Sequence, residues 1–172
     1  MMIVTKSIIA GAQRYLGENV DYFYDLAAVS GGAFRGFLRF SRYSALRKHA
    51  PKTLIHLARL GSTMEEDCGP CLRIGFRLAK RDGVPEAMLR AALNREYGKF
   101  SPEGARAFAF GRAISSGEVA EADRLGEEIE TAHGRKVRTE LALAAATARV
   151  FPALKRGLGY AKSCSITRFE DL

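Results

Sequence analysis

The chain has 172 residues, of which 47% are hydrophobic and 27% are charged, and its formal net charge is +8. This balance is typical of a globular protein and excludes a disordered chain, and the length suits one domain. No apolar run approaches the roughly 18 residues that span a bilayer. The first sixteen residues also lack the pattern of a secretory signal, so we expect a cytoplasmic protein.

We expect a single domain over residues 1–172, with N-terminal helices in 1–50, a core in 51–160 and a tail in 161–172. Apolar residues recur at helical spacing over residues 4–16, and Gly17 ends that helix. An aromatic-rich segment follows over residues 22–29. In residues 34–42 the spacing is again helical, with arginines at Arg35, Arg39 and Arg42. Pro51 precedes a further helix through about Leu60, with a stop at Gly61 and Ser62.

The second half of the chain continues as helices. One begins near the first cysteine and ends at Gly83, and Pro85 opens the next. Ser101 is a helix N-cap ahead of Pro102 and Glu103. A helix over residues 119–129 ends by Gly134, and an Ala- and Leu-rich helix begins near Lys136 and is kinked or broken near Pro152. Clear β alternation is absent, so we predict a compact, all-α fold.

The basic residues gather in two stretches without any acidic residue, between Asp25 and Glu65 and between Leu141 and Phe169. Such stretches can attract nucleic acid or anionic lipid. They also occur as solvated faces, or as one side of a subunit interface whose acidic partner lies elsewhere, for example in residues 118–130. We favour the latter two interpretations, so nucleic acid is not an expected partner.

Two of the three cysteines form the motif Cys68-Gly-Pro-Cys71. In a cytosolic protein a CxxC is more often redox-active or metal-binding than structural. Three-residue spacing at a helix start brings the two sulfurs within reach of a disulfide, so the pair can cycle between dithiol and disulfide. A helix N-terminus also favours the thiolate, which is the nucleophile. We predict that this helix faces the one that contains Leu54 and Leu57.

Helical spacing assigns the two faces of the cysteine helix. The polar face should carry Arg73, Arg77, Lys80 and Arg81, and the inward side Cys71, Ile74 or Gly75, and Leu78. The acidic run of residues 65–67 disfavours a thiolate at Cys68, whereas a basic neighbour and the helix end favour it, and the sequence leaves the balance open.

Two other interpretations of the cysteine pair remain. The cysteines could be small buried residues at a helix start. A structural zinc site would need two further ligands, from Cys164 and the three histidines. We predict neither a metal nor a cofactor.

Several segments share the order of a known family. They are the helix of residues 52–61, the CxxC, an arginine-bearing helix up to Gly83-Val84-Pro85-Glu86, the segment 101–113 and the Ala-rich segment after Glu140. Together, over roughly residues 45–160, they resemble the core of the alkylhydroperoxidase D-like proteins in the carboxymuconolactone decarboxylase superfamily. The resemblance implies that fold, a cysteine pair that reduces peroxide and is re-reduced by a partner dithiol protein, and assembly into trimers or larger oligomers.

The chain departs from that family's motif at the proton relay. The family has a glutamate twelve residues before the first cysteine and a histidine four residues after the second, and these positions hold His56 and Gly75. A rearranged relay would use His56 as the base and Glu65 or Glu66 as the carboxylate. By helical phase, however, His56 shares a polar stripe with Arg59, so we expect it on the surface.

These observations predict a thiol-dependent peroxidase or disulfide oxidoreductase, with the candidate site residues Cys68, Cys71, His56, Glu65 and Glu66. The resemblance assigns attack on peroxide to Cys71, whereas the helix-end argument favours Cys68. Two alternatives are a decarboxylase of the same superfamily, whose members do not use a CxxC, and a basic helical module for nucleic acid or a membrane surface. The aromatic, acid-free segment 34–43 predicts a homo-oligomer held by residues before about Thr53.

Overall fold

The computed structural model describes residues 2–161, with side chains from Val4 onward. Over this range the chain is helical and contains no strand, so the predicted all-α class is confirmed. No helix in this range is long and apolar enough to cross a membrane. The elements are α1 (Met2–Leu16), α2 (Asp21–Val29), α3 (Gly31–Ser44), α4 (Lys52–Met64), α5 (Gly69–Arg81), α6 (Glu86–Leu93), the 3-10 turn η1 (Tyr97–Lys99), α7 (Pro102–Ser116), α8 (Val119–His133) and α9 (Arg135–Gly157).

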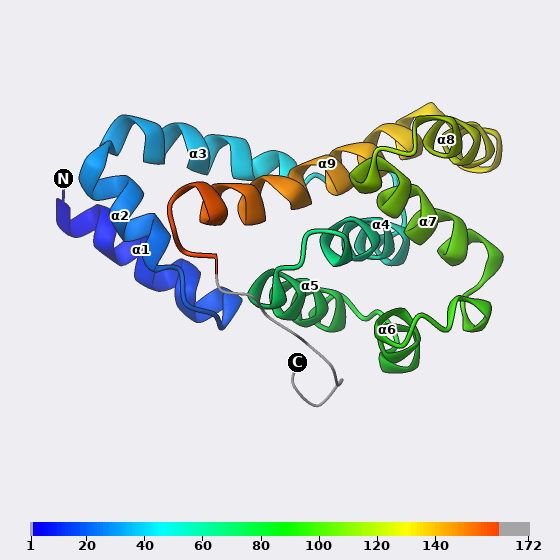
Figure 1. Ribbon diagram of the computed structural model, residues 1–172, viewed down its shortest axis with the longest axis horizontal. Coiled ribbons are helices and arrows are strands. Elements are labelled where there is room, and N and C mark those ends of the chain that lie inside the picture. The colour runs from blue at the N-terminus through cyan, green and yellow to red at the C-terminus, as the bar shows by residue number, and fades with distance from the viewer. Residues whose placement is uncertain (1, 162–172) are drawn as a thin grey trace.

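The long helix α9 joins two hydrophobic clusters (Figure 1). Its 23 residues extend for about 35 Å. The larger cluster lies among α4–α9, and the smaller one lies among α1–α3 and the last turns of α9. The predicted kink or break at Pro152 does not end the helix, which continues to Gly157. Phe151 and Leu154 pack into the smaller cluster and hold these turns in place.

The centre of the larger cluster is the crossing of α4 and α7, where two glycines let the helix backbones touch. A Cβ atom on Gly61 would lie 2.2 Å from the carbonyl oxygen of Phe108, and one on Gly111 would lie 1.9 Å from that of Ala58. Only hydrogen fits at either position. The prediction that Gly61 ends its helix is therefore wrong, because this glycine permits a close contact inside α4, which continues to Met64.

A single carboxylate on α9 fixes the turn that leads into α4. The side chain of Glu140 is buried and accepts hydrogen bonds from the backbone N–H groups of Lys48, His49 and Ala50, at 2.9–3.1 Å. Burial by itself raises the pKa of Glu140, but the three backbone donors outweigh it and hold this pKa below its ordinary value. The start of α4 is thereby tied to a helix about 90 residues later in the chain.

The aromatic side chains of α3 fill the smaller cluster. Phe34 is only 2% exposed, and the ring of Phe37 packs edge-on against Phe151 with 5.4 Å between centroids. Packing within one chain therefore accounts for much of the aromatic surface from which an oligomer was predicted. Tyr43, at 58% exposure, is the main aromatic side chain of α3 left outside. The homo-oligomer remains a prediction.

The α4–α7 crossing can be tested by adding one methyl group. We expect Gly111→Ala to lower the free energy of unfolding by about 3 kcal/mol or more, because the new Cβ collides with backbone, which cannot rotate away. Gly36→Ala is the matched control. Gly36 lies in α3 with nothing within 4 Å of its added Cβ, so this change should be neutral or stabilise by up to about 1 kcal/mol. Urea unfolding measures both, and equal stability of the two variants would contradict the proposed contact.

Candidate active site

The CxxC begins α5, as predicted. Cys68 is the N-cap residue and Pro70 occupies the first turn, where the missing N–H of proline costs no helical hydrogen bond. The sulfurs of Cys68 and Cys71 form a disulfide, with 5.3 Å between the two Cα atoms. α5 packs against α4, the helix that contains Leu54 and Leu57, so this part of the fold prediction is also confirmed.

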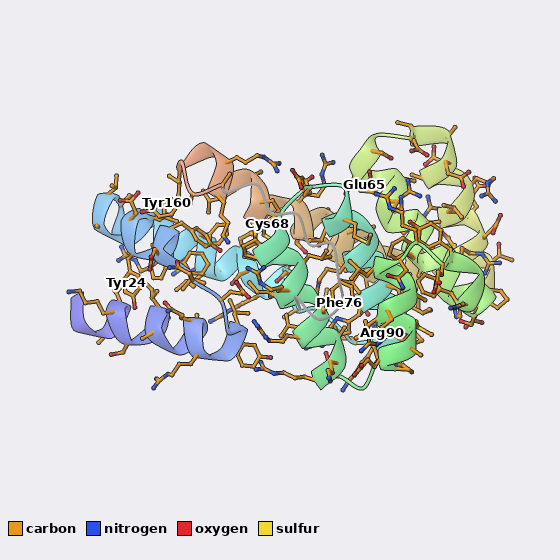
Figure 2. All side chains as sticks on the ribbon, turned by 60° about the horizontal axis from the view of Figure 1, so that its bottom comes forward. Tyr24, Glu65, Cys68, Phe76, Arg90 and Tyr160 are labelled. Atoms are coloured by element: carbon orange, nitrogen blue, oxygen red, sulfur yellow. A yellow bond between two sulfur atoms is a disulfide. The ribbon has the colours of Figure 1, made fainter. Side chains whose placement is uncertain are left out.

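Cys68 lies on the wall of a cleft of about 740 Å³, near the middle of the molecule's long axis (Figure 2). The cleft lies between the start of α2, the turn before α5 and the end of α9. Of the two cysteines, Cys68 is the one that lines it. The other lining residues are Glu18, Asn19, Asp21, Tyr22, Glu66, Asp67, Pro70, Arg73, Pro152, Lys155, Arg156, Gly159, Tyr160 and Ala161.

Two of the three acidic residues just before Cys68, Glu65 and Glu66, are paired with arginines. Glu66 is buried and accepts hydrogen bonds from Arg149 Nε at 2.8 Å and Arg156 Nη2 at 2.5 Å. Glu65 accepts one from Arg112 Nε at 2.8 Å. Burial raises the pKa of Glu66, but the two arginines outweigh it and hold this pKa low. The sequence left open whether these carboxylates disfavour a thiolate at Cys68. For Glu65 and Glu66 the negative charge is balanced by arginine.

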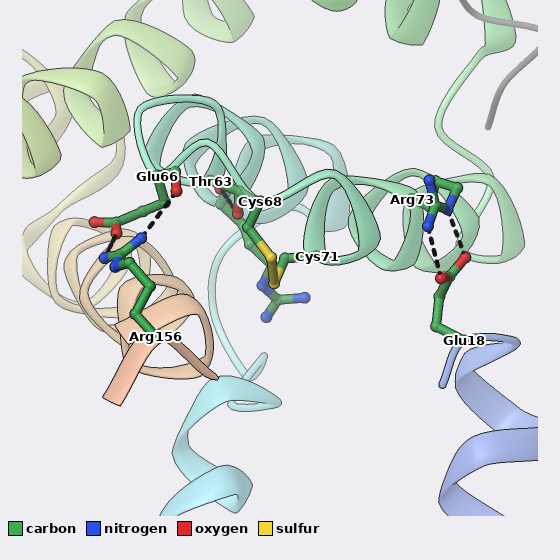
Figure 3. The surroundings of a disulfide bond; sticks show 8 residues. Glu18, Thr63, Glu66, Cys68, Cys71, Arg73 and Arg156 are labelled. Carbon is green, nitrogen blue, oxygen red and sulfur yellow. Dashed lines mark hydrogen bonds and ion pairs between the residues drawn. A yellow bond between two sulfur atoms is a disulfide. The ribbon is translucent and has the colours of Figure 1, made fainter. Parts of the chain in front are cut away.

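A second carboxylate–arginine cluster lies on the other side of the disulfide (Figure 3). Arg73 donates two hydrogen bonds to Glu18 at 2.7 and 2.9 Å, and Arg77 lies 3.3 Å from the same carboxylate. Burial raises the pKa of Glu18, but the arginines again lower it overall. Each cluster on either side of Cys68 therefore holds two arginines for one carboxylate. The predicted polar face of α5 thus binds the turn between α1 and α2.

The buried face of α5 is shifted by one position along the helix from the predicted one. Leu72, Phe76 and Ala79 are buried, whereas Cys71 and Leu78 are only partly buried. Gly75 is also buried, and a Cβ at this position would lie 3.0 Å from Leu60 Cδ2. The position that the family motif gives to histidine therefore faces α4 and the core, and the cleft lies elsewhere.

His56 is completely buried, so the prediction that it lies on the surface is wrong. The prediction assumed that one face of α4 is exposed to solvent. Instead, α4 is enclosed by α5, α7 and α9. Its Nε2 lies 2.7 Å from Oδ2 of Asp82, the residue that ends α5. Because α5 separates its two ends by about 20 Å, His56 lies at the far end of α5 from Cys68. With His56 on Asp82 and the two glutamates on arginines, the rearranged relay is not assembled.

The imidazole of His56 is held neutral. Burial lowers the pKa of His56 to about 3, and the nearby charges of Arg59, Arg47 and Lys52 lower it in the same direction. Asp82, the carboxylate that His56 faces, also pairs with Arg47 and Lys52. In the neutral ring Nε2–H donates to Asp82, and Nδ1 has no hydrogen-bond partner among the described residues.

Most residues of the cleft wall were not predicted as site residues, and Lys155 and Tyr22 are two of them. Lys155 is only 7% exposed, and its Nζ lies 5.2 Å from the centroid of the Tyr22 ring. One feature of the sequence could have indicated Lys155. It lies within an apolar stripe of α9 formed by Phe151, Leu154 and Leu158, and a lysine is rarely buried at such a position.

The described residues hold no group of three or more His, Cys, Asp or Glu side chains placed to bind a metal ion. The zinc alternative invoked Cys164, which lies outside those residues. The three histidines that it also invoked are spread over the fold. His56 lies on α4, His133 ends α8, and His49 precedes α4.

The buried histidine predicts a pH dependence of stability. Between pH 6.5 and 4.5 the unfolded chain binds a proton at His56 and the folded chain does not, so stability falls as the pH falls, by up to about 1.4 kcal/mol per pH unit. The lowered carboxylate pKa values act only below about pH 4.5. Urea unfolding at pH 7.0, 5.5 and 4.5 should show a smaller loss of stability for His56→Gln than for the parent. An unchanged slope in His56→Gln would contradict the assignment.

The chain was compared with protein-family models, with curated proteins and with solved structures, and no match was found in any of the three.

Proposed function

We propose that this chain is a thiol-dependent oxidoreductase of the alkylhydroperoxidase D-like type, in which Cys68 and Cys71 reduce a peroxide and are re-reduced by a dithiol. The observation that carries the proposal is the disulfide at the N-terminus of α5, with Cys68 on the wall of a cleft of about 740 Å³. A cleft of this size accommodates a small organic molecule. A cytoplasmic location suits the proposal, because thiol reductants are maintained there.

We assign the attack on the peroxide to the Cys68 sulfur. As the N-cap residue it lies beside the backbone N–H groups of the first helical turn, which have no intrahelical acceptor and stabilise an anion. Pro70 lacks one of these donors, so Gly69 and Cys71 supply them. The two carboxylate–arginine clusters add positive charge on both sides. This assignment differs from the one implied by the family, which gives the attack to Cys71.

The proposed reaction uses only the two cysteines and a proton. The Cys68 thiolate attacks one peroxide oxygen, the O–O bond breaks, and the leaving oxygen takes a proton to become an alcohol or water. Cys68 is then a sulfenic acid. The Cys71 thiol attacks the Cys68 sulfur, the S–S bond forms, and the sulfenic oxygen leaves as water. A thiolate of a dithiol reductant attacks Cys68, and Cys71 leaves as a thiolate. The second thiol of the reductant then attacks the reductant's own sulfur in this mixed disulfide, which releases Cys68 as a thiolate and leaves the reductant as a disulfide.

We expect slow peroxide turnover, because no histidine lines the cleft in the described part of the chain. The base that the family motif supplies is absent at Gly75, and His56 lies at the other end of α5. General acid–base assistance is worth about 10²–10⁴-fold in rate. Turnover should therefore fall short of that of a protein with the complete motif by a factor in this range.

Single-cysteine variants test the proposal, all in a Cys164→Ser background to remove the third thiol. At neutral pH, reduced Cys71→Ser, which retains Cys68, should react with an aromatic disulfide at least about tenfold faster than Cys68→Ser. Both variants denatured in urea serve as controls for intrinsic thiol reactivity and should react alike. Peroxide consumption with dithiothreitol should be measurable for the Cys164→Ser parent and lost when Cys68 and Cys71 are both replaced by Ser.

Two outcomes would count against these assignments, and they are distinct. If a variant in which Cys68 and Cys71 are both replaced by Ser consumes peroxide as fast as the parent, the redox function is wrong. If the pair does turn over peroxide but the two single-cysteine variants react equally with the disulfide probe, the function stands and Cys68 is not the preferred nucleophile.

A further inference from the structure

Several exposed cations on the second half of the molecule are matched by carboxylates. Lys80 and Arg90 pair with Glu86, and Arg124 pairs with Glu121 and Glu128. The arginines of α3 differ. Arg35, Arg39 and Arg42 are all exposed, and no carboxylate in the described part of the chain lies within ion-pair distance of any of them. Among the described residues, Arg14, Arg95 and Arg135 are also exposed without an ion pair, but each lies on a different part of the fold. On α3, three such arginines occur on one helix.

These three arginines form one row, which we call the arginine face of α3. At 100° per residue, positions 35, 39 and 42 fall within about 60° of one another, and they extend for about 10 Å along the axis. The opposite side of α3 is fixed by Phe34 and Phe37, which pack into the smaller hydrophobic cluster. Because the helix is anchored from behind, the guanidinium groups are presented on a rigid support.

An exposed aromatic ring adjoins the arginine face. Tyr43 lies one turn after Arg39, next to Arg42, and is 58% exposed. The basic surface continues beyond the helix with the exposed side chain of Lys48. Guanidinium groups bind phosphate with paired hydrogen bonds, and an exposed aromatic ring stacks on unpaired bases.

Two competing partners for this face fit the structure less well. A second copy would need an unmatched acidic surface. On α8, Glu121, Glu128 and Glu130 are paired with arginines of their own chain, which leaves two exposed carboxylates on that helix, Asp123 and Glu127, to meet three arginines. A peripheral membrane helix inserts its apolar face into the bilayer. The apolar face of α3 is already packed inside the protein.

We propose that the arginine face of α3 binds single-stranded nucleic acid, with Arg35, Arg39 and Arg42 on successive phosphates and Tyr43 stacked on a base. A row about 10 Å long faces about three phosphates of one strand. This inference does not depend on the redox chemistry of Cys68 and Cys71. From the sequence alone, nucleic acid was not an expected partner. The proposal differs because the sequence could not show that these arginines lack carboxylate partners among the described residues.

Fluorescence anisotropy with a labelled single-stranded oligonucleotide tests the inference over a series of salt concentrations. The triple variant Arg35→Gln, Arg39→Gln, Arg42→Gln should bind at least about tenfold more weakly than the parent, and the slope of log affinity against log salt should shrink by about 2. The matched control is Arg90→Gln, Lys99→Gln, Arg124→Gln. It removes the same charge from ion-paired sites, and its affinity should stay within about threefold of the parent. Circular dichroism verifies that both variants are folded.

Tyr43→Leu separates stacking from simple charge attraction. It should weaken binding to the single strand about tenfold and leave binding to a duplex of the same length unchanged. Three results would overturn the proposal. They are equal weakening by the two triple variants, no effect of Tyr43→Leu on the single strand, and binding of the parent to anionic vesicles that is tighter than its binding to the oligonucleotide.

Discussion

The backbone contact between α4 and α7 is the constraint on which the other features depend. Gly61 and Gly111 let the two helices approach until each backbone touches the other, and α4 is then covered by α5, α7 and α9 as well. An enclosed helix must satisfy its polar side chains internally. Ser62 donates to the carbonyl of Ala145 at 2.8 Å, and His56 donates to Asp82. Because α4 is held in this way, the position of its C-terminal end, a few residues before Cys68, is also fixed.

A few carboxylates tie the remaining elements to this centre. Glu140 binds the turn before α4, Glu66 binds α9 through two arginines, and Glu18 binds α5 through two more. Each accepts several donors, which offsets the cost of burying a charge. Glu18 and Glu66 also line the cleft beside the disulfide. The ion pairs that hold the helices together therefore also shape the surroundings of Cys68. In a chain of net charge +8 this use of carboxylates leaves the arginine face of α3 unmatched.

The two ends of α5 have different chemistry. Its N-terminus carries the cysteine pair among backbone donors and arginines, and its C-terminus carries Asp82 against a neutral, buried His56. Because about one helix length separates them, His56 contributes to the stability of the fold and its dependence on pH. The proposed thiol chemistry relies instead on the helix terminus and the flanking arginines. Such an arrangement stabilises a thiolate but provides no histidine to move a proton, which is the physical basis for a slow peroxidase.

The sequence by itself determined the features that depend on neighbouring residues. The helices follow from local spacing and punctuation such as Ser101, whose side chain caps α7, and Gly134, which ends α8, and the position of the CxxC at a helix start is equally local. Tertiary structure decided which helix faces are buried, because that depends on which other helices cover them. From the sequence, Gly61 is predicted to end its helix, and only its contact with α7 explains why it lies inside α4. His56 is predicted to be exposed, and only the enclosure of α4 explains why it is buried. The cleft joins residues about 90 positions apart, such as Glu66 and Arg156, and helical periodicity carries no information about which helices meet.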